Sequence, residues 1–305
     1  MLLSLTMRLV AAAGLGATAL TVGGLAAPVQ GKVADAAPAC LIPQTNEPAA
    51  AARGGAPGVD HREITVAEQR AITRRTHRLL ATNAAARIGG TALVAATVPV
   101  YVHVMRNNAG RGDVTNGQIY QQIAVLNQDF AQVGASFNLV DVRRYNNSAW
   151  HQDQQSARYR ALTRLGGANA LNIWLIDSGH LGIATFPWDY PGNRAVDGIR
   201  IDYESLPGGS IVHYNEGKTA VHEIGHWLGL FHTFQGGCTT TNDQVADTPA
   251  QATPTTGCPA NRDSCRMPGA DPIHNYMDYS WDSCYTEFTQ GQTERINRMW
   301  AAYRA

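Results

Sequence analysis

A stretch in the last third of the chain reads His222-Glu223-Ile224-Gly225-His226-Trp227-Leu228-Gly229-Leu230-Phe231-His232. His222 and His226 lie four positions apart, so on a helix they share one face and both can reach the same metal ion. Glu223 projects from the adjacent position, where its carboxylate can take a proton from a zinc-bound water. This H-E-x-x-H spacing is typical of zinc metalloproteases.

His232 is the candidate third ligand, although it lies six positions after His226 and would face away from the metal on a continuing helix. Gly229 removes that objection, because glycine adopts a positive φ easily and can end a helix in a sharp turn. We therefore predict that the chain doubles back after Gly229 and that His222, His226 and His232 hold zinc.

The alternative for this stretch is a surface helix whose polar residues are solvated. The positions between the polar residues argue against it, because they would set the histidines against a core, where unpaired imidazoles are costly. These positions are all apolar apart from the glycines: Ile224, Trp227, Leu228, Leu230 and Phe231.

The composition and the N-terminus indicate an exported enzyme. The 305 residues carry a formal net charge of zero, so nothing favours nucleic acid or an anionic membrane as a partner. Arg8 precedes an apolar run that ends in small residues, and we predict a signal peptide over residues 1–27. A membrane anchor is the alternative, but the run is short and rich in Gly and Ala. We expect a secreted, extracellular monomer with no membrane association once the signal is removed.

Four of the five cysteines cluster in the last quarter of the chain, namely Cys238, Cys258, Cys265 and Cys284. In an oxidising compartment they would form two disulfides, with three possible connectivities. A structural zinc site is the competing interpretation, but the sequence has no C-x-x-C pair. Cys40 is left over.

Residues 28–94 are predicted to form a pro-segment. Its first part, to about residue 63, is rich in Ala, Pro and Gly and has little to build a core. Thr65 and Glu68 then form a capping-box pattern, which predicts a helix to about Leu80. That helix is rich in arginine, and the sequence leaves open whether it packs across a cleft or is solvated.

Residues 95–305 are predicted to form the catalytic domain, of the α+β class. Alternation and β-branched content predict five strands, and helical periodicity after capping residues predicts helices from Thr115 and Thr289, with another near 154–162. We expect a twisted mixed sheet with backing helices and the active-site helix in an upper subdomain. An irregular, disulfide-linked lower subdomain would end in a C-terminal helix. The predicted strands are 98–105, 137–142, 171–176, 181–186 and 198–203.

The histidine motif resembles that of the metzincin metalloproteases, and a second element supports the resemblance. Asn275-Tyr276-Met277-Asp278-Tyr279-Ser280 looks like a Met-turn, which in that clan lies beneath the metal. The resemblance implies that Met277 forms an apolar floor, where a methionine fills an irregular space. It also implies that Tyr279 approaches the metal or stabilises the tetrahedral intermediate. Ordinary core packing is the alternative for both residues.

Within the clan, the chain resembles the pappalysin family, especially its short secreted microbial members. The resemblance rests on HEIGHWLGLFHTFQGG from His222, on VADTP from Val245 and on the Met-turn, and it covers about residues 97–305. It implies disulfides Cys238–Cys265 and Cys258–Cys284. It also implies a calcium ion after the active-site helix, for which Asp243 and Thr248 could supply oxygens. A capped polar loop is the alternative there.

The resemblance also suggests a role for Cys40. Some metzincin zymogens are held inactive by a pro-segment cysteine that binds the zinc, and thiolate is a good zinc ligand. Ala39 and Leu41 do not match the usual neighbours of such a cysteine. An intermolecular disulfide or a free thiol is an equal alternative.

Together these features predict a secreted zinc endopeptidase that is made as a zymogen and acts on proteins or peptides. Glu223 would take the proton from the attacking zinc-bound water and pass it to the leaving amine. The substrate would lie antiparallel to the strand 181–186, and similar microbial enzymes suggest a preference for arginine after the scissile bond. One alternative is a secreted module that binds zinc but does not cut, although Glu223 is intact. Another is a different metal hydrolase, which the third histidine and the Met-turn disfavour.

Overall fold

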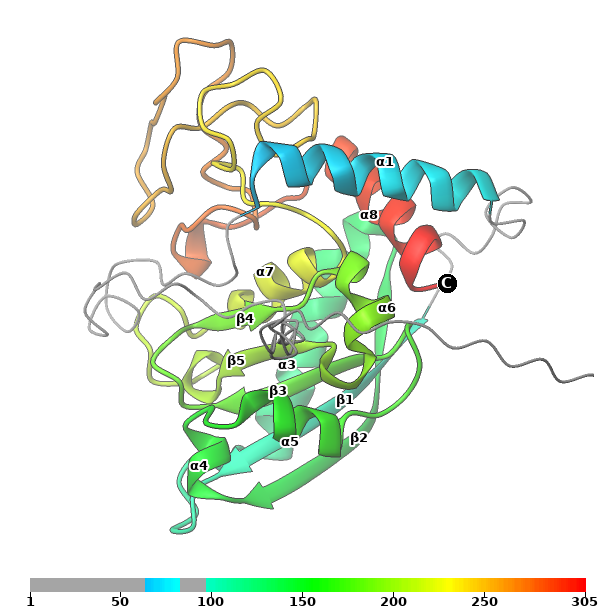
Figure 1. The fold of residues 1–305 in the computed structure, drawn as a ribbon. Coiled ribbons are helices and arrows are strands. Elements are labelled where there is room, and N and C mark those ends of the chain that lie inside the picture. The colour runs from blue at the N-terminus through cyan, green and yellow to red at the C-terminus, as the bar shows by residue number, and fades with distance from the viewer. Residues whose placement is uncertain (1–63, 83–96) are drawn as a thin grey trace, which may run out of the picture. The chain divides into compact units, whose positions relative to one another are not determined.

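The computed structural model describes residues 64–82 and 97–305 (Figure 1). The predicted signal peptide, the first part of the pro-segment and Cys40 lie outside the described residues. Among the helices that are described, none is long and apolar enough to cross a membrane.

The described domain is built on a five-stranded mixed sheet with the order β2-β1-β3-β5-β4. All neighbouring pairs are parallel except β4 and β5, which are antiparallel, so β4 forms one edge with reversed direction. The α+β prediction is therefore confirmed, with a mixed sheet. The strands are β1 (Thr97–Arg106), β2 (Ser136–Asn146), β3 (Leu171–Ile176), β4 (Gly182–Ala184) and β5 (Ile199–Asp202).

The central strand β3 has the bounds that its apolar run predicts, and all six of its residues are buried. An unbroken apolar strand belongs in a sheet that is covered on both faces. The other edge strand, β2, extends beyond the predicted end at Val142. The prediction ended there because the next residues are polar, including Arg143 and Arg144. At an edge these side chains reach solvent, so polarity does not end the strand.

Helices cover both faces of the sheet, and the strand alternation decides which residues each face buries. On one face, Leu171, Ile173 and Leu175 of β3 join a large core with α3 (Asn116–Asp129) and α7 (Lys218–Trp227). On the other face, Trp174 and Ile176 pack with Tyr159 of α5 (Ser156–Thr163).

The helix predicted over 154–162 is α5, which begins two residues later, and a separate short helix that was not predicted, α4 (Ser148–His151), precedes it. Asp153 and Gln155 adopt positive φ angles of 58° and 57°. A right-handed helix cannot pass through such residues, and hydrophobic periodicity does not reveal them. The Asp153 carboxylate is tied to Arg200 and to the hydroxyl of Tyr159, contacts that only the folded chain provides.

After α7 the chain is irregular until α8 (Gln290–Tyr303), apart from short turns. Disulfides Cys238–Cys265 and Cys258–Cys284 link this region, in the pairing that the family resemblance implied. Figure 1 shows α7 between the sheet and these loops. The capping box that predicts α8 is present, because the Thr289 side chain accepts from Gln292 N and the Gln292 side chain accepts from Thr289 N. A further short helix, α6 (Tyr190–Asn193), lies between β4 and β5 in the chain.

The arginine-rich helix α1 (Val66–Thr82) packs along α8, which decides the question that the sequence left open (Figure 1). Ile72 is buried in a second apolar cluster with Phe231 and Met299. The Thr76 hydroxyl lies 3.1 Å from the Tyr303 hydroxyl, and Gln235 donates to the Ile64 carbonyl at 2.9 Å. Although it belongs to the predicted pro-segment, α1 is part of the packed domain.

Candidate metal centre

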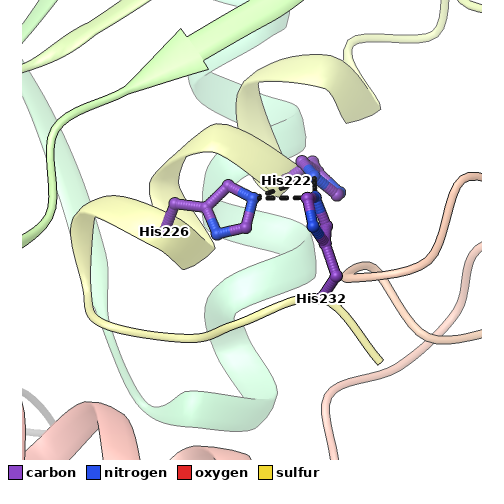
Figure 2. Close-up of side chains that lie close together, drawn as sticks. All are labelled: His222, His226 and His232. Atoms are coloured by element: carbon purple, nitrogen blue, oxygen red, sulfur yellow. Dashed lines mark hydrogen bonds between the residues drawn. The ribbon is translucent and has the colours of Figure 1, made fainter. Parts of the chain in front are cut away.

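The three histidines of the motif converge on one point (Figure 2). Their Nε2 atoms form a nearly equilateral triangle, with 3.2 Å between His222 and His226, 3.2 Å between His222 and His232, and 3.1 Å between His226 and His232. Two nitrogens bound at 2.0–2.1 Å to a tetrahedral zinc lie about 3.3 Å apart. The triangle therefore has the size of one face of a zinc coordination tetrahedron.

The second nitrogen of two of these rings fixes the tautomer. His222 Nδ1 donates to the Tyr276 carbonyl at 2.7 Å, and His226 Nδ1 donates to the Leu230 carbonyl at 2.9 Å. Since a carbonyl can only accept, the proton of each neutral ring is on Nδ1 and its Nε2 presents a lone pair. Facing lone pairs at this distance repel one another unless a cation lies between them.

The turn after α7 brings His232 back to the other two rings. Gly229 has a φ of 99°, and Leu230 N donates to the Gly225 carbonyl at 2.9 Å, which closes the end of the helix. A β-carbon on Gly229 would also lie only 2.6 Å from Cγ of Met299. The position therefore excludes other residues both by its conformation and by its surroundings.

The Met-turn lies against α7. Met277 is fully buried, and its sulfur occupies the space that a β-carbon on Gly225 would need, so glycine is required in the motif at that position. The Asn275 side chain accepts from Met277 N and donates to Gln292 of α8. The turn thus supplies both a floor beneath the helix and, through Tyr276, the acceptor that orients His222.

Glu223 is 2% exposed and lines a pocket next to His222. Gly182 of β4 lies against it, and a β-carbon at that glycine would collide with the Glu223 carboxylate. Tyr279 lines the same pocket, with its ring centroid 4.7 Å from that of His232 and 5.6 Å from that of His222. The general-base candidate and the tyrosine are thus brought to the histidine triangle.

The pocket also contains Asp282, which sequence reasoning missed. Its carboxylate is 1% exposed and accepts a hydrogen bond from Glu216 N at 2.9 Å. Burial raises the pKa of Asp282 to about 7, although the backbone hydrogen bonds to Glu216 and Lys218 oppose the shift. The Lys218 ammonium binds Asp129 at 2.7 Å and does not neutralise Asp282. The pocket is lined by Leu181, Gly182, Tyr214, Lys218, Thr219, His222, Glu223, Tyr279, Asp282 and Tyr285.

The chain matches a protein-family model and several known proteins. The family model described as pregnancy-associated plasma protein-A, a peptidase family, matches residues 172–301. An extracellular metalloprotease of Colletotrichum graminicola is 45% identical over 242 residues, which cover 77% of this chain and 86% of that protein. An extracellular metalloprotease of Pyricularia oryzae is 46% identical over 218 residues, covering 69% and 77%.

Solved structures of mirolysin also align with this chain. Mature mirolysin of Tannerella forsythia, in complex with a cleaved peptide, aligns with a TM-score of 0.58 at 29% identity, covering 68% of this chain and 96% of that one. A promirolysin variant aligns with a TM-score of 0.63 at 28% identity, covering 78% and 89%.

The chain belongs to the pappalysin family. This pappalysin is an extracellular zinc metalloendopeptidase, as its sequence predicts. Within the part of the chain that the structure describes, the histidine triangle is the one cluster of three or more His, Cys, Asp or Glu side chains arranged to hold a metal ion.

The pappalysin also buries Asp243 and Thr248, the residues predicted to bind calcium. Asp243 Oδ1 accepts from Val245 N at 3.0 Å. The Asp243 and Thr248 side chains lie side by side, and their interaction and the charge of Arg295 both lower the pKa of Asp243 without offsetting its burial. Burial raises the pKa of Asp243 to about 8, so its ionised form is poorly compensated.

Gly182 is expected to fix the position of the Glu223 carboxylate, because no larger side chain fits beside it. Gly182→Ala forces the Glu223 carboxylate to move, and a misplaced base slows proton transfer, so we expect kcat for a peptide substrate to fall by about tenfold to a hundredfold. Zinc content should stay at the wild-type level. Gly192→Ala is the matched control, because a β-carbon there meets no atom within 4 Å. Equal kcat values for the two variants would contradict the assigned contact.

Proposed function

We propose that His222, His226 and His232 hold the zinc ion of this endopeptidase. The observation that carries the proposal is the triangle of Nε2 atoms, 3.1 to 3.2 Å apart, which has the size of one face of a zinc coordination tetrahedron. When bound, zinc acidifies water and polarises the scissile carbonyl.

Glu223 acts as the general base and then as the general acid. Its carboxylate faces the pocket beside His222, where a water would attack the peptide carbonyl. It takes the proton from this water as the new C–O bond forms and delivers the proton to the leaving nitrogen as the C–N bond breaks. Tyr279, on the other wall, donates a hydrogen bond to the oxygen that becomes negative during the attack.

The substrate binds as an extended chain antiparallel to β4. This strand is at the edge of the sheet, and the pocket wall begins at its first residue, Gly182, and the preceding Leu181. Backbone pairing at a sheet edge holds a peptide without selecting its side chains. The pocket beside the histidines then selects among substrate side chains.

Glu223→Gln tests the mechanism against the alternative of a silent zinc-binding module. Gln has the same shape but cannot accept the proton, so kcat on denatured casein should fall about 10²- to 10⁴-fold, with zinc content unchanged. A zinc chelator should abolish cleavage by the wild type. Cleavage by the variant at the wild-type rate would refute the role of Glu223. A processed, zinc-loaded wild type that cuts nothing would favour the silent module.

The pocket residue Asp282 selects a basic side chain on the residue after the scissile bond. A buried carboxylate without a cationic partner is costly, and an arginine side chain would neutralise it. This extends the preference that the family resemblance suggests and names the residue responsible for it.

Asp282→Asn should lower kcat/KM for peptides with arginine at that position by about tenfold to a hundredfold, because a charge-assisted hydrogen bond is lost. Peptides with leucine there should change by less than about threefold. Since burial raises the pKa of Asp282 to about 7, the carboxyl is neutral below that pH and ionised above it. The wild-type preference for arginine over leucine should therefore rise as the pH increases through 7. A preference that is independent of pH and of the substitution would contradict the assignment.

We also propose that Asp243 and Thr248 bind calcium. Their two buried side-chain oxygens lie close together and suit a hard cation, with carbonyl groups completing the shell. Because the folded-state pKa of Asp243 is raised to about 8, the calcium-free protein loses stability as the pH rises from about 4 to 8. Calcium favours the ionised carboxylate, so it stabilises most at the high end of that range.

In thermal unfolding at pH 8, millimolar calcium should raise the Tm of the wild type by several degrees. Asp243→Asn should remove that response and raise the Tm in the absence of calcium. Asp263→Asn, an exposed position in the same disulfide-linked region, should respond as the wild type does. A wild-type Tm that calcium leaves unchanged would refute the site.

We propose that the protein is made as a zymogen, with a signal over residues 1–27 and a pro-segment that begins at residue 28. Because α1 shares an apolar cluster with Phe231, beside His232, we propose that α1 stays with the mature enzyme. The maturation cut then precedes residue 64 or leaves α1 bound without a covalent link. N-terminal sequencing of the secreted enzyme would distinguish these and show whether Cys40 leaves, as a zymogen zinc ligand must.

A further inference from the structure

Two buried arginines approach the end of the active-site helix from the C-terminal part of the chain. Arg295 of α8 is 4% exposed, and Arg304, which follows α8, is 1% exposed. Burying a guanidinium is costly unless its donors and its charge are compensated. Arg298, on the same helix, has a half-exposed side chain and makes only a loose pair with Glu294, at 3.8 Å.

Both buried arginines donate to backbone carbonyls at the C-terminal end of α7. Arg295 Nε donates to the Gly229 carbonyl at 2.7 Å, and Arg304 Nε donates to the Trp227 carbonyl at 3.0 Å. The last carbonyls of a helix have no acceptor role within it and form the negative end of its dipole. Arg304 caps one of these carbonyls, and Arg295 binds the turn that directly follows the helix.

Each guanidinium also lies over an aromatic ring of the same segment. Arg295 lies 4.6 Å from the centroid of Phe231, and Arg304 lies 3.7 Å from that of Trp227. Arg304 is further held by the Asp197 carboxylate at 3.0 Å, so its charge is balanced by a structural ion pair. Arg295 has no such ion pair within 4 Å among the described residues, although the buried Asp243 carboxylate is near enough to favour its charged form. Its hydrogen bond and its ring contact are both with the turn.

The contacts of Arg295 lead to two of the three histidines. The carbonyl that it binds belongs to Gly229, and the next carbonyl, that of Leu230, accepts the hydrogen bond that orients His226. The ring beneath Arg295 belongs to Phe231, which directly precedes His232. The Arg295 side chain therefore contacts the turn at two points. One is next to the carbonyl that orients His226, and the other is the residue that precedes His232.

We propose that Arg295 is a positioning residue for the zinc site, which sets the affinity for the metal by holding the turn from Gly229 to Phe231. The inference rests on the proposed zinc role of the three histidines. It predicts that charge alone is not sufficient at position 295. A guanidinium donates from Nε while its flat face covers an aromatic ring, whereas a lysine ammonium is a compact charge that cannot do both.

The test compares Arg295→Lys and Arg295→Gln with Arg298→Met, the control on the exposed side of α8. Each processed enzyme is loaded with zinc or with cobalt, and zinc affinity is measured by competition with a chromogenic chelator. The visible spectrum of the cobalt form reports the geometry of the ligands independently of activity. We expect both Arg295 variants to bind zinc about tenfold more weakly, in the range found when groups that orient metal ligands are removed. Their cobalt spectra should be altered, while Arg298→Met should match the wild type.

Thermal unfolding separates this role from a purely structural one. If Arg295→Lys has a lower Tm but wild-type zinc affinity and cobalt spectrum below that Tm, the inference is overturned. If Arg295→Gln does not fold, the lysine variant decides the question by the same measurements. A wild-type protein that gives no cobalt spectrum would overturn the zinc assignment itself and this inference with it.

Discussion

Three imidazole Nε2 atoms lie 3.1 to 3.2 Å apart in a buried site, and contacts from the surrounding structure hold them there. Unfavourable convergence of this kind persists only where other contacts enforce it. The carbonyls of Tyr276 and Leu230 hold two of the rings in the tautomer that exposes Nε2. Met277 fills the space against Gly225, and the positive φ of Gly229 returns the chain toward the metal. A metal ion bound by the three rings, as proposed, would make this close approach favourable.

Because α7 carries two histidines and Glu223, both of its ends are fixed by the rest of the domain. At its beginning, Lys218 is bound to Asp129 of α3, and Asp282 accepts from the Lys218 backbone at 3.4 Å. At its end, Arg304 binds the carbonyl of Trp227, and Arg295 binds that of Gly229 in the turn that follows. The same Asp282 borders the substrate pocket, so the helix start and the pocket share one carboxylate.

The sequence alone could predict those features whose causes are local. The capping boxes at Thr115 and Thr289, the apolar run of β3 and the histidine spacing all act within one or two helical turns or a single strand. What it could not predict depends on contacts between distant segments. The break between α4 and α5 is held by Arg200, and the docking of α1 needs the face of α8. Asp282 carries no motif, and Gly182 becomes significant only when β4 meets Glu223. Such residues gain their roles only when folding brings distant segments of the chain together.

X-ray absorption spectroscopy at the zinc edge of the processed enzyme is the decisive measurement for the three-histidine site. We expect one zinc ion per chain, with three imidazole nitrogens at about 2.0–2.1 Å and one oxygen ligand from water. His232→Ala should remove one imidazole from that shell. A sulfur ligand in the processed enzyme, or an imidazole shell that His232→Ala leaves unchanged, would contradict it.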